Sequence, residues 1–340
     1  MLSNKDRIVS VLVWLLLLVT APGMAGAAGS KASNENFTLE VFQDGSEVMV
    51  RFYDKQADLY RSDGPYIYRA VRTHENGEEV YSRLEGVKIQ SQGDRISVTG
   101  QLAGLEFEQI FRVPKDKPYV EEQIKLTNQT GSTVCLREFE SRMQIKVAEA
   151  GGQVLPSFAQ DHFMAIPFLH RSTDSQGYRN DFTIEHLLTQ EGRVFRVGGW
   201  PPGQVPGKHY LSDAWAWRHG DGSFGIFSFN QDNLIFSFLT PVSQENGSSL
   251  RFGGVCRDSM VLSALDRFEN GRTLELGLTR YQHVPGDYQD CAYAYRDMLD
   301  EKNCRFPAGF NPPVHWNQLY NMEGAWNDRK DNYTLDRVLQ

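Results

Sequence analysis

The sequence predicts a mainly β protein, in which a large β-sandwich is followed by a linker helix and then by the first strand and helix of an α/β unit. Three observations predict this order. Apolar residues alternate with polar ones through much of segment 36–147, apolar residues recur at helical spacing after residue 287, and Pro307, Pro312 and Pro313 precede a new apolar run. Alternation with a period of two is typical of half-buried strands, whereas spacings of three and four mark one face of a helix.

The first 27 residues have the pattern of a secretory signal peptide. Lys5 and Arg7 form a short basic region, an apolar run extends from Ile8 to Val19, and Ala25-Gly26-Ala27 offers a cleavage site. The apolar run is short for a bilayer span, which takes about 20 residues. An uncleaved membrane anchor is the alternative. We therefore expect export to the periplasm or the extracellular space.

Composition narrows the class of partner. The 340 residues carry a formal net charge of -8 and are 40% hydrophobic, which allows a sizeable core. An acidic chain argues against nucleic-acid binding, because contact with phosphates needs a basic face. The four cysteines include no C-x-x-C pair and the eight histidines show no metal-ligand spacing, so we expect no metal and no cofactor. Cys291 and Cys304 are the one close pair, and both a disulfide and two separate thiols stay open.

Residues 28–286 are assigned to the sandwich. Phe37, Leu39 and Val41 alternate with polar positions, and Asp44-Gly45 then supplies a hairpin turn. The segments Phe224–Phe229 and Leu234–Leu239 are apolar almost throughout, which predicts central strands covered on both faces. Further strands are expected at 48–52, 96–98, 105–107, 120–126, 261–265 and 274–281.

From residue 156 to 217 the alternation fades, and glycine, proline and aromatic residues dominate. A long irregular stretch inside a regular domain is commonly functional. Trp200, Trp215 and Trp217 lie here, with Asp213 among them. Aromatic faces beside carboxylates suit a sugar, whose C–H faces stack on rings while its hydroxyls bond to polar side chains. We predict Trp200, Asp213 and Trp215 as substrate-binding residues, with packing of the tryptophans onto the sandwich as the alternative.

Residues 287–313 are expected to form a linker helix and a Pro-rich linker. Asp287 can cap a helix that runs to Asp300, and Cys291 lies on the apolar stripe of that helix, where we expect a buried thiol. Residues 314–340 then begin a second domain. Val314–Tyr320 has the pattern of a strand, and Thr334 can cap a further helix.

The segment Asn311-Pro312-Pro313-Val314-His315-Trp316-Asn317-Gln318-Leu319-Tyr320 resembles the opening of the barrel in α-galactosidases of glycoside hydrolase family 36 and their melibiase-like relatives. In those enzymes a β-supersandwich of the galactose-mutarotase-like type precedes the barrel, joined to it by a helix and a Pro-rich linker. The resemblance implies that residues 314–340 are the incomplete start of a (β/α)8 catalytic domain. It also implies that Trp316 and Asn317 contact substrate. The family tends to have a second Trp and a Glu where Gln318-Leu319-Tyr320 stand here, so galactose specificity stays open.

The resemblance further implies a retaining mechanism, in which one carboxylate attacks the anomeric carbon and another protonates the leaving oxygen. In the family these carboxylates lie on the fourth and sixth barrel strands, so we expect no catalytic residue within this chain, which alone should be inactive. The sequence thus predicts the N-terminal portion of an exported, α-galactosidase-like glycoside hydrolase with carbohydrate as its partner. Two alternatives stay open: a non-catalytic carbohydrate-binding sandwich, and a sugar mutarotase using His162 or His209 together with a Glu.

Overall fold

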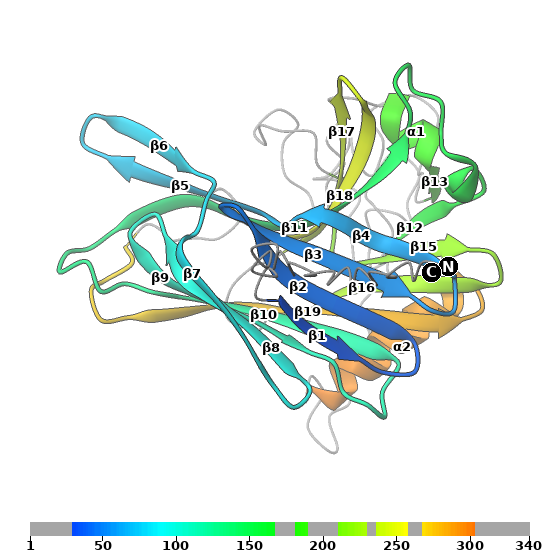
Figure 1. The fold of residues 1–340 in the computed structure, drawn as a ribbon, viewed down its shortest axis with the longest axis horizontal. Helices are drawn as coiled ribbons and strands as arrows, with labels where there is room; N and C mark the ends of the chain where they lie inside the picture. The colour runs from blue at the N-terminus through cyan, green and yellow to red at the C-terminus, as the bar shows by residue number, and fades with distance from the viewer. Residues whose placement is uncertain (1–28, 167–180, 190–209, 230–235, 258–266, 303–340) are drawn as a thin grey trace, which may run out of the picture. The chain divides into compact units, whose positions relative to one another are not determined.

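The computed structural model describes most of the β region and the helix that follows it. The described residues are 29–166, 181–189, 210–229, 236–257 and 267–302. The chain divides into two compact units, Met1–Met298 and Leu299–Gln340, and the second is described only over residues 299–302. Within the first unit the strands form three antiparallel sheets (Figure 1).

The first sheet has four strands in chain order. They are β1 (Gly29–Ser33), β2 (Phe37–Asp44), β3 (Glu47–Asp54) and β4 (Leu59–Pro65). The predicted hairpin at Asp44-Gly45 is confirmed, since Asp44 pairs with Glu47 and Gly45 has a φ of 58°. A positive φ at the first residue of a two-residue loop matches the turns that follow the twist of a hairpin, and glycine adopts it without strain.

The second sheet has nine strands and forms one layer of the sandwich. In spatial order they are β13 (Asp181–Thr183), β12 (His162–Ile166), β15 (Ala214–His219), β16 (Gly222–Phe229), β19 (Thr273–Pro285), β10 (Tyr119–Thr127), β9 (Leu105–Arg112), β8 (Arg95–Leu102) and β7 (Glu85–Gln92). The predicted strands at 96–98, 105–107, 120–126 and 274–281 are therefore confirmed.

The third sheet has six strands and continues the layer of the first. Its order is β14 (Tyr210–Ser212), β17 (Phe236–Gln244), β18 (Gly247–Arg257), β11 (Cys135–Ala148), β5 (Ile67–His74) and β6 (Gly77–Tyr81). The Ser62 hydroxyl of β4 donates to the backbone oxygen of Gln144 in β11 at 3.1 Å, which joins the two smaller sheets side by side.

The core lies between the nine-stranded sheet and these two sheets. Phe52 of β3 lies 5.6 Å from the rings of both Phe224 and Tyr281 on the large sheet. Phe252 of the six-stranded sheet lies 6.2 Å from Phe224. All four rings are fully buried, so the aromatic packing that joins the layers is also where the core is densest in large side chains. Figure 1 shows β2 and β3 lying across β16 and β19.

Helix α2 (Tyr288–Glu301) confirms that a helix follows Asp287, as predicted. The Asp287 side chain accepts from the Gln289 backbone N–H at 2.8 Å, and Asp290 accepts in turn from the Asp287 N–H at 3.0 Å, a reciprocal N-cap. Tyr295 of the helix lies 5.5 Å from the Phe227 ring on the outer face of β16, so this strand is covered on both faces as predicted. Cys291 is fully buried, as its place on the stripe predicted, and its thiol is free.

Several predictions need correction or lie outside the described residues. The stretch 156–217 is less irregular than predicted, since its described parts contain β12, β13, β14, β15 and the short helices Pro156–Phe158 and α1 (Ile184–Thr189). The leader, the strands predicted at 261–265 and 314–320 and the helix after Thr334 lie outside the described residues. Among the described helices, none is long and apolar enough to span a membrane.

Candidate functional site

Two histidines on the inner face of the nine-stranded sheet each lie beside an aspartate. His219 Nδ1 is 2.8 Å from Asp161 Oδ1, and His283 Nδ1 is 3.8 Å from Asp54 Oδ1. Asp161 and Asp54 are both buried. His219 shares its strand face with Trp217, two residues earlier, and Trp217 donates its indole N–H to Asp161 Oδ2 at 2.6 Å. We call the side chains of His219, Asp161, His283, Asp54 and Arg61 the His–Asp–Arg cluster.

Strand register brings the two histidines together. His219 pairs with Gly222 of β16, and Phe224, two residues on, pairs with His283 of β19. A Cβ atom at Gly222 would meet His283 Cε1 at 3.0 Å. Because glycine has no such atom, the His283 imidazole can lie against β16 on the row that carries His219.

Arg61 of β4 closes the cluster from the opposite sheet. Its Nε and Nη2 donate to Asp54 Oδ2 at 3.0 and 2.9 Å, and its guanidinium lies 4.6 Å from the Trp217 ring centroid. Among the described residues, Arg61 Nη1 and His283 Nδ1 find no hydrogen-bond partner, since 3.8 Å is too long for a bond to Asp54. Unpartnered buried polar atoms are rare in folded proteins, and two in one cluster mark it as a functional candidate.

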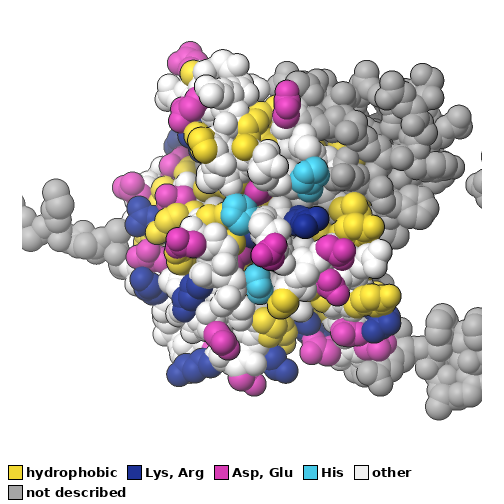
Figure 2. Space-filling view, turned by 90° about the vertical axis from the view of Figure 1, so that its right-hand side faces the viewer, with side chains coloured by type: hydrophobic (Ala, Val, Ile, Leu, Met, Phe, Trp, Pro, Cys, Tyr) yellow, Lys and Arg dark blue, Asp and Glu magenta, His cyan; other side chains and the backbone are white. Residues whose placement is uncertain are grey.

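Burial shifts the pKa values of His283 and Arg61 in this cluster. It lowers the pKa of His283 below the ordinary value, although the Asp54 charge acts in the opposite direction. Burial also lowers the pKa of Arg61, which Asp54 and Asp161 raise. The side chains of His219 and His283 keep 24% and 13% of their surface exposed, so both imidazoles reach the solvent. Figure 2 shows histidine side chains among acidic and basic ones on one face of the molecule. Imidazoles flanked by carboxylates are suited to proton transfer near neutral pH.

Another buried carboxylate, that of Glu122 in β10, lies outside this cluster and has several hydrogen-bond partners. It accepts from the Tyr281 hydroxyl at 2.6 Å and also from Tyr66 and Gln109, and Tyr68 donates to Gln109 at 2.5 Å. Burial raises the pKa of Glu122 while the three donors lower it. Because all its partners lie in the core and are buried, this network ties the sheets together and has no access for a ligand.

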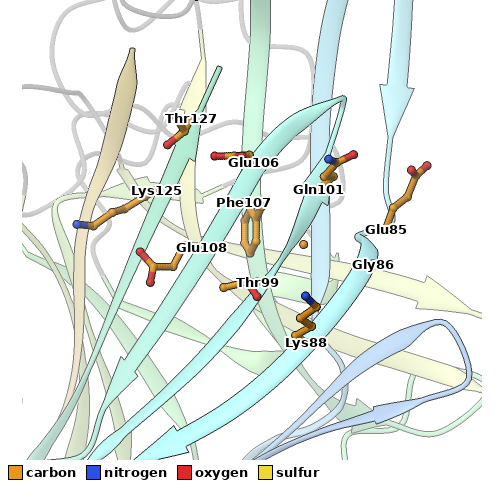
Figure 3. Close-up of a pocket in the computed structure, with 11 residues that line it drawn as sticks. Glu85, Gly86, Lys88, Thr99, Gln101, Glu106, Phe107, Glu108, Lys125 and Thr127 are labelled. Carbon is orange, nitrogen blue, oxygen red and sulfur yellow. The ribbon is translucent and has the colours of Figure 1, made fainter. Parts of the chain in front are cut away.

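An open cavity of about 740 Å³ lies on the outer face of the large sheet, where β7, β8, β9 and β10 run side by side (Figure 3). We call it the outer cavity. Its lining residues are mostly polar and include both charges: Glu85, Gly86, Lys88, Thr99, Gly100, Gln101, Glu106, Phe107, Glu108, Lys125 and Thr127. A polar, open cavity of this size fits a hydroxylated ligand better than an apolar one.

The predicted substrate-binding residues have different positions. Trp215 is fully buried and donates its indole N–H to the Ser237 backbone oxygen at 3.4 Å. This position favours the packing alternative and gives no support to sugar stacking by Trp215. Asp213 is half-buried just before β15, and burial raises the pKa of its carboxyl. Trp200, Trp316 and Asn317 lie outside the described residues.

Sequence reasoning missed the histidines that the structure places together. It named His162 as a candidate, but His162 is exposed, whereas the neighbouring Asp161 bonds to His219, 58 residues away. The missed signal is the alternation Trp215, Trp217, His219, which continues one strand face. Among the described residues no group of three or more His, Cys, Asp and Glu side chains could hold a metal ion.

Comparisons with known proteins assign this chain to no family. No protein-family model matches the chain. No curated protein matches its sequence. A galactose mutarotase related enzyme from Lactobacillus acidophilus is similar in structure with 11% identity and a TM-score of 0.43, over 76% of this chain and 98% of that one. A GH36 α-galactosidase from Geobacillus stearothermophilus is similar with 9% identity and a TM-score of 0.45, over 77% of this chain and 41% of that one. An α-galactosidase from Lactobacillus brevis has 9% identity and a TM-score of 0.42, over 78% and 40%. The chain thus spans about two fifths of these α-galactosidases, and at such identities the likeness assigns no activity.

Proposed function

We propose that this chain is the carbohydrate-binding β-supersandwich portion of an exported glycoside hydrolase of the α-galactosidase type. The order of elements carries the proposal. A large β-sandwich ends at β19, helix α2 follows directly, and the Pro-rich segment then leads into Asn311–Tyr320, which resembles the first barrel strand of that family. The polar lining of the outer cavity supports a hydroxylated ligand.

On this proposal the reaction is a retaining hydrolysis whose two carboxylates come from a (β/α)8 barrel that residues 314–340 begin. Retention requires carboxyl groups about 5 Å apart, one attacking the anomeric carbon while the other protonates the leaving oxygen. Trp316 and Asn317 would contact substrate at the first barrel strand, because the carboxyl ends of the strands form the mouth of such barrels. The sandwich itself contributes glycan contacts and no catalytic group.

The test compares two samples. The protein purified from its natural source should hydrolyse a nitrophenyl α-galactoside with retention, observed as the first-formed anomer by NMR. Residues 1–340 expressed alone should release no nitrophenol. Release of nitrophenol by the isolated chain would contradict the proposal that the catalytic groups belong to the barrel. If the natural protein hydrolyses none of a panel of α-linked glycosides, the non-catalytic binding alternative remains.

The His–Asp–Arg cluster favours a second candidate, the interconversion of sugar anomers. Asp161 fixes His219 through Nδ1, which leaves Nε2 as the basic nitrogen. In such a reaction a base removes the anomeric hydroxyl proton, an acid protonates the ring oxygen, and the ring bond opens and recloses on the other face. His219 and His283 are the candidates for these roles, in place of the exposed His162 of the sequence-based hypothesis, whose other candidate, His209, lies outside the described residues. Polarimetry on freshly dissolved galactose decides it: acceleration over buffer that is lost in His219→Asn supports this candidate, and no acceleration excludes it.

A further inference from the structure

We propose that the outer cavity is a binding site for a neutral oligosaccharide, held by Lys88 and Glu106 with Thr99 and Gln101 beside them. The inference rests on the proposed function and deepens it, because it assigns the glycan contact to a particular face of the sandwich. It differs from the sequence-based prediction, which placed sugar binding at the tryptophans of segment 156–217.

An irregularity in β7 shapes the cavity. The register of β7 against β8 shifts between Glu85 and Lys88, and Gly86 within this bulge has a φ of 62°. The Glu85 backbone oxygen comes so close to Gly100 that a Cβ there would lie 2.7 Å from it. A bulge bends its strand and redirects the neighbouring side chains. Both glycines line the cavity, so the irregularity leaves a hollow where a regular ladder would place side chains.

The base of the hollow is apolar and its walls are polar. Phe107 pairs with Gly100 across β8 and β9, lines the cavity and is itself only 2% exposed. Thr99 and Gln101 flank Gly100 on β8 and offer a hydroxyl and an amide. Figure 3 shows the labelled side chains coming from adjacent strands of one sheet, so they are held by a continuous hydrogen-bonded frame.

Some charged residues that line the cavity already form ion pairs, whereas others remain available to a ligand. Lys125 lies 2.7 Å from Glu275 and Glu108 lies 3.2 Å from Arg95, so these two already have partners. Lys88 and Glu106 form no ion pair with another described residue. One ammonium that donates and one carboxylate that accepts therefore face the cavity uncommitted.

The ammonium of Lys88 and the carboxylate of Glu106 together indicate which class of ligand the cavity binds. A carboxylate accepts hydrogen bonds from adjacent hydroxyls and an ammonium donates to hydroxyl or ring oxygens, so together they recognise a polyol. With Glu85 also on the rim, the uncommitted charges sum to about -1, which disfavours phosphorylated or uronic sugars. The volume of about 740 Å³ exceeds that of one sugar ring and indicates an oligosaccharide.

The experiment is calorimetric titration of the full chain with raffinose, an oligosaccharide bound in a solved variant of the GH36 α-galactosidase, and with stachyose. The cavity variants are Glu106→Gln and Lys88→Met, which remove a charge with little change of volume. Matched controls are Glu47→Gln and Lys115→Met, which make the same changes at exposed positions on other parts of the sandwich. Far-ultraviolet circular dichroism and the melting temperature verify that each variant is folded.

Each cavity variant should weaken binding by about tenfold or more, since each removes a hydrogen bond to a charged group, while both controls bind as the unchanged chain does. If the chain binds but the cavity variants behave as the controls, the cavity assignment is overturned and carbohydrate binding stands. If the chain binds neither sugar, the cavity proposal and the binding part of the proposed function both fall, whereas the hydrolysis test on the natural protein still decides the enzyme assignment.

Discussion

Replacing Arg61 by methionine tests how the two layers are held together at the His–Asp–Arg cluster. Methionine keeps most of the volume of the arginine stem but removes the charge and both hydrogen bonds to Asp54. Asp54 would then keep only the backbone N–H groups of Gln56 and Ala57, at 3.2 and 3.3 Å. An unpaired carboxylate would remain in a site with no exposure to solvent.

The expected cost follows from burial. Removing one partner of a buried ion pair costs about 3–5 kcal/mol, because the other charge stays buried without compensation. The guanidinium also lies 4.6 and 4.9 Å from the Trp217 and Phe224 ring centroids, and a desolvated cation over such rings is worth up to about 2 kcal/mol. We therefore expect Arg61→Met to lower the free energy of unfolding by about 3–5 kcal/mol.

Arg51 on the adjacent strand provides the matched control. It lies 3.1 Å from Asp63, but both side chains are nearly half exposed, at 48% and 47%. Arg51→Met should therefore cost at most about 1 kcal/mol. The double variant Asp54→Asn with Arg61→Met should recover part of the loss, because the uncompensated charge is then gone.

Urea unfolding followed by tryptophan fluorescence measures all of these variants, since Trp215 and Trp217 are fully buried reporters of the sandwich. An Arg61→Met variant no less stable than Arg51→Met would refute the reasoning. A double variant less stable than Arg61→Met alone would show that loss of the hydrogen bonds, and not the stranded charge, dominates.

Four further predictions concern single side chains. Because its ring is fully buried, Trp215→Ala should lower the free energy of unfolding by about 3–5 kcal/mol and leave the affinity for raffinose unchanged. Loss of binding by a folded variant would restore the sugar-stacking hypothesis. Burial raises the pKa of the Cys291 thiol to about 12, so mass spectrometry should find it unmodified by iodoacetamide until the chain unfolds, and rapid modification of the folded chain would contradict this. Burial lowers the pKa of His283, so below about pH 6.5 the unfolded chain binds the proton more readily than the folded chain. The free energy of unfolding should therefore fall with falling pH less steeply in His283→Gln than in the unchanged chain; equal pH slopes from urea titrations would count against a lowered pKa of His283. Gly225→Ala should cost about 1–3 kcal/mol, because its Cβ would meet the Phe227 ring at 2.3 Å, and an unchanged melting temperature would indicate that the ring can move freely.

Local patterns sufficed where one face of an element decides its structure. The hairpin at Asp44-Gly45 and helix α2 both follow from a turn or cap residue beside regular apolar spacing. The prediction that β16 is covered on both faces also holds, because Phe224 packs in the core and Phe227 packs under α2. In each case the determining residues lie within a few positions of one another.

Strand β11 shows why other elements were not predicted from the sequence. Its 14 residues include Glu138, Glu140 and Arg142, which read as polar surface in the sequence but are buried in the sheet. Glu140 pairs with Arg142 and Glu138 with Arg69, so these charges are matched inside the fold. Ion pairing of buried charges, within one strand or between two, leaves no apolar periodicity in the sequence.

The His–Asp–Arg cluster was also not predicted from the sequence. Asp54, Arg61, Asp161, His219 and His283 come from segments as far apart as residues 54 and 283, and only the crossing of the sheets brings them together. The outer cavity depends on a strand bulge at Gly86, which the alternation of β7 does not reveal. Sequence reasoning reached the class of fold and the carbohydrate hypothesis, but the candidate sites required the register of the strands.

Calorimetric titration of the full chain with raffinose and stachyose is the decisive measurement, because the proposed glycan-binding role of this sandwich does not depend on catalysis. We expect saturable heat of binding that disappears when the chain is unfolded in urea and that weakens in Glu106→Gln but not in Glu47→Gln. No saturable heat with either sugar would contradict the claim that this sandwich binds carbohydrate.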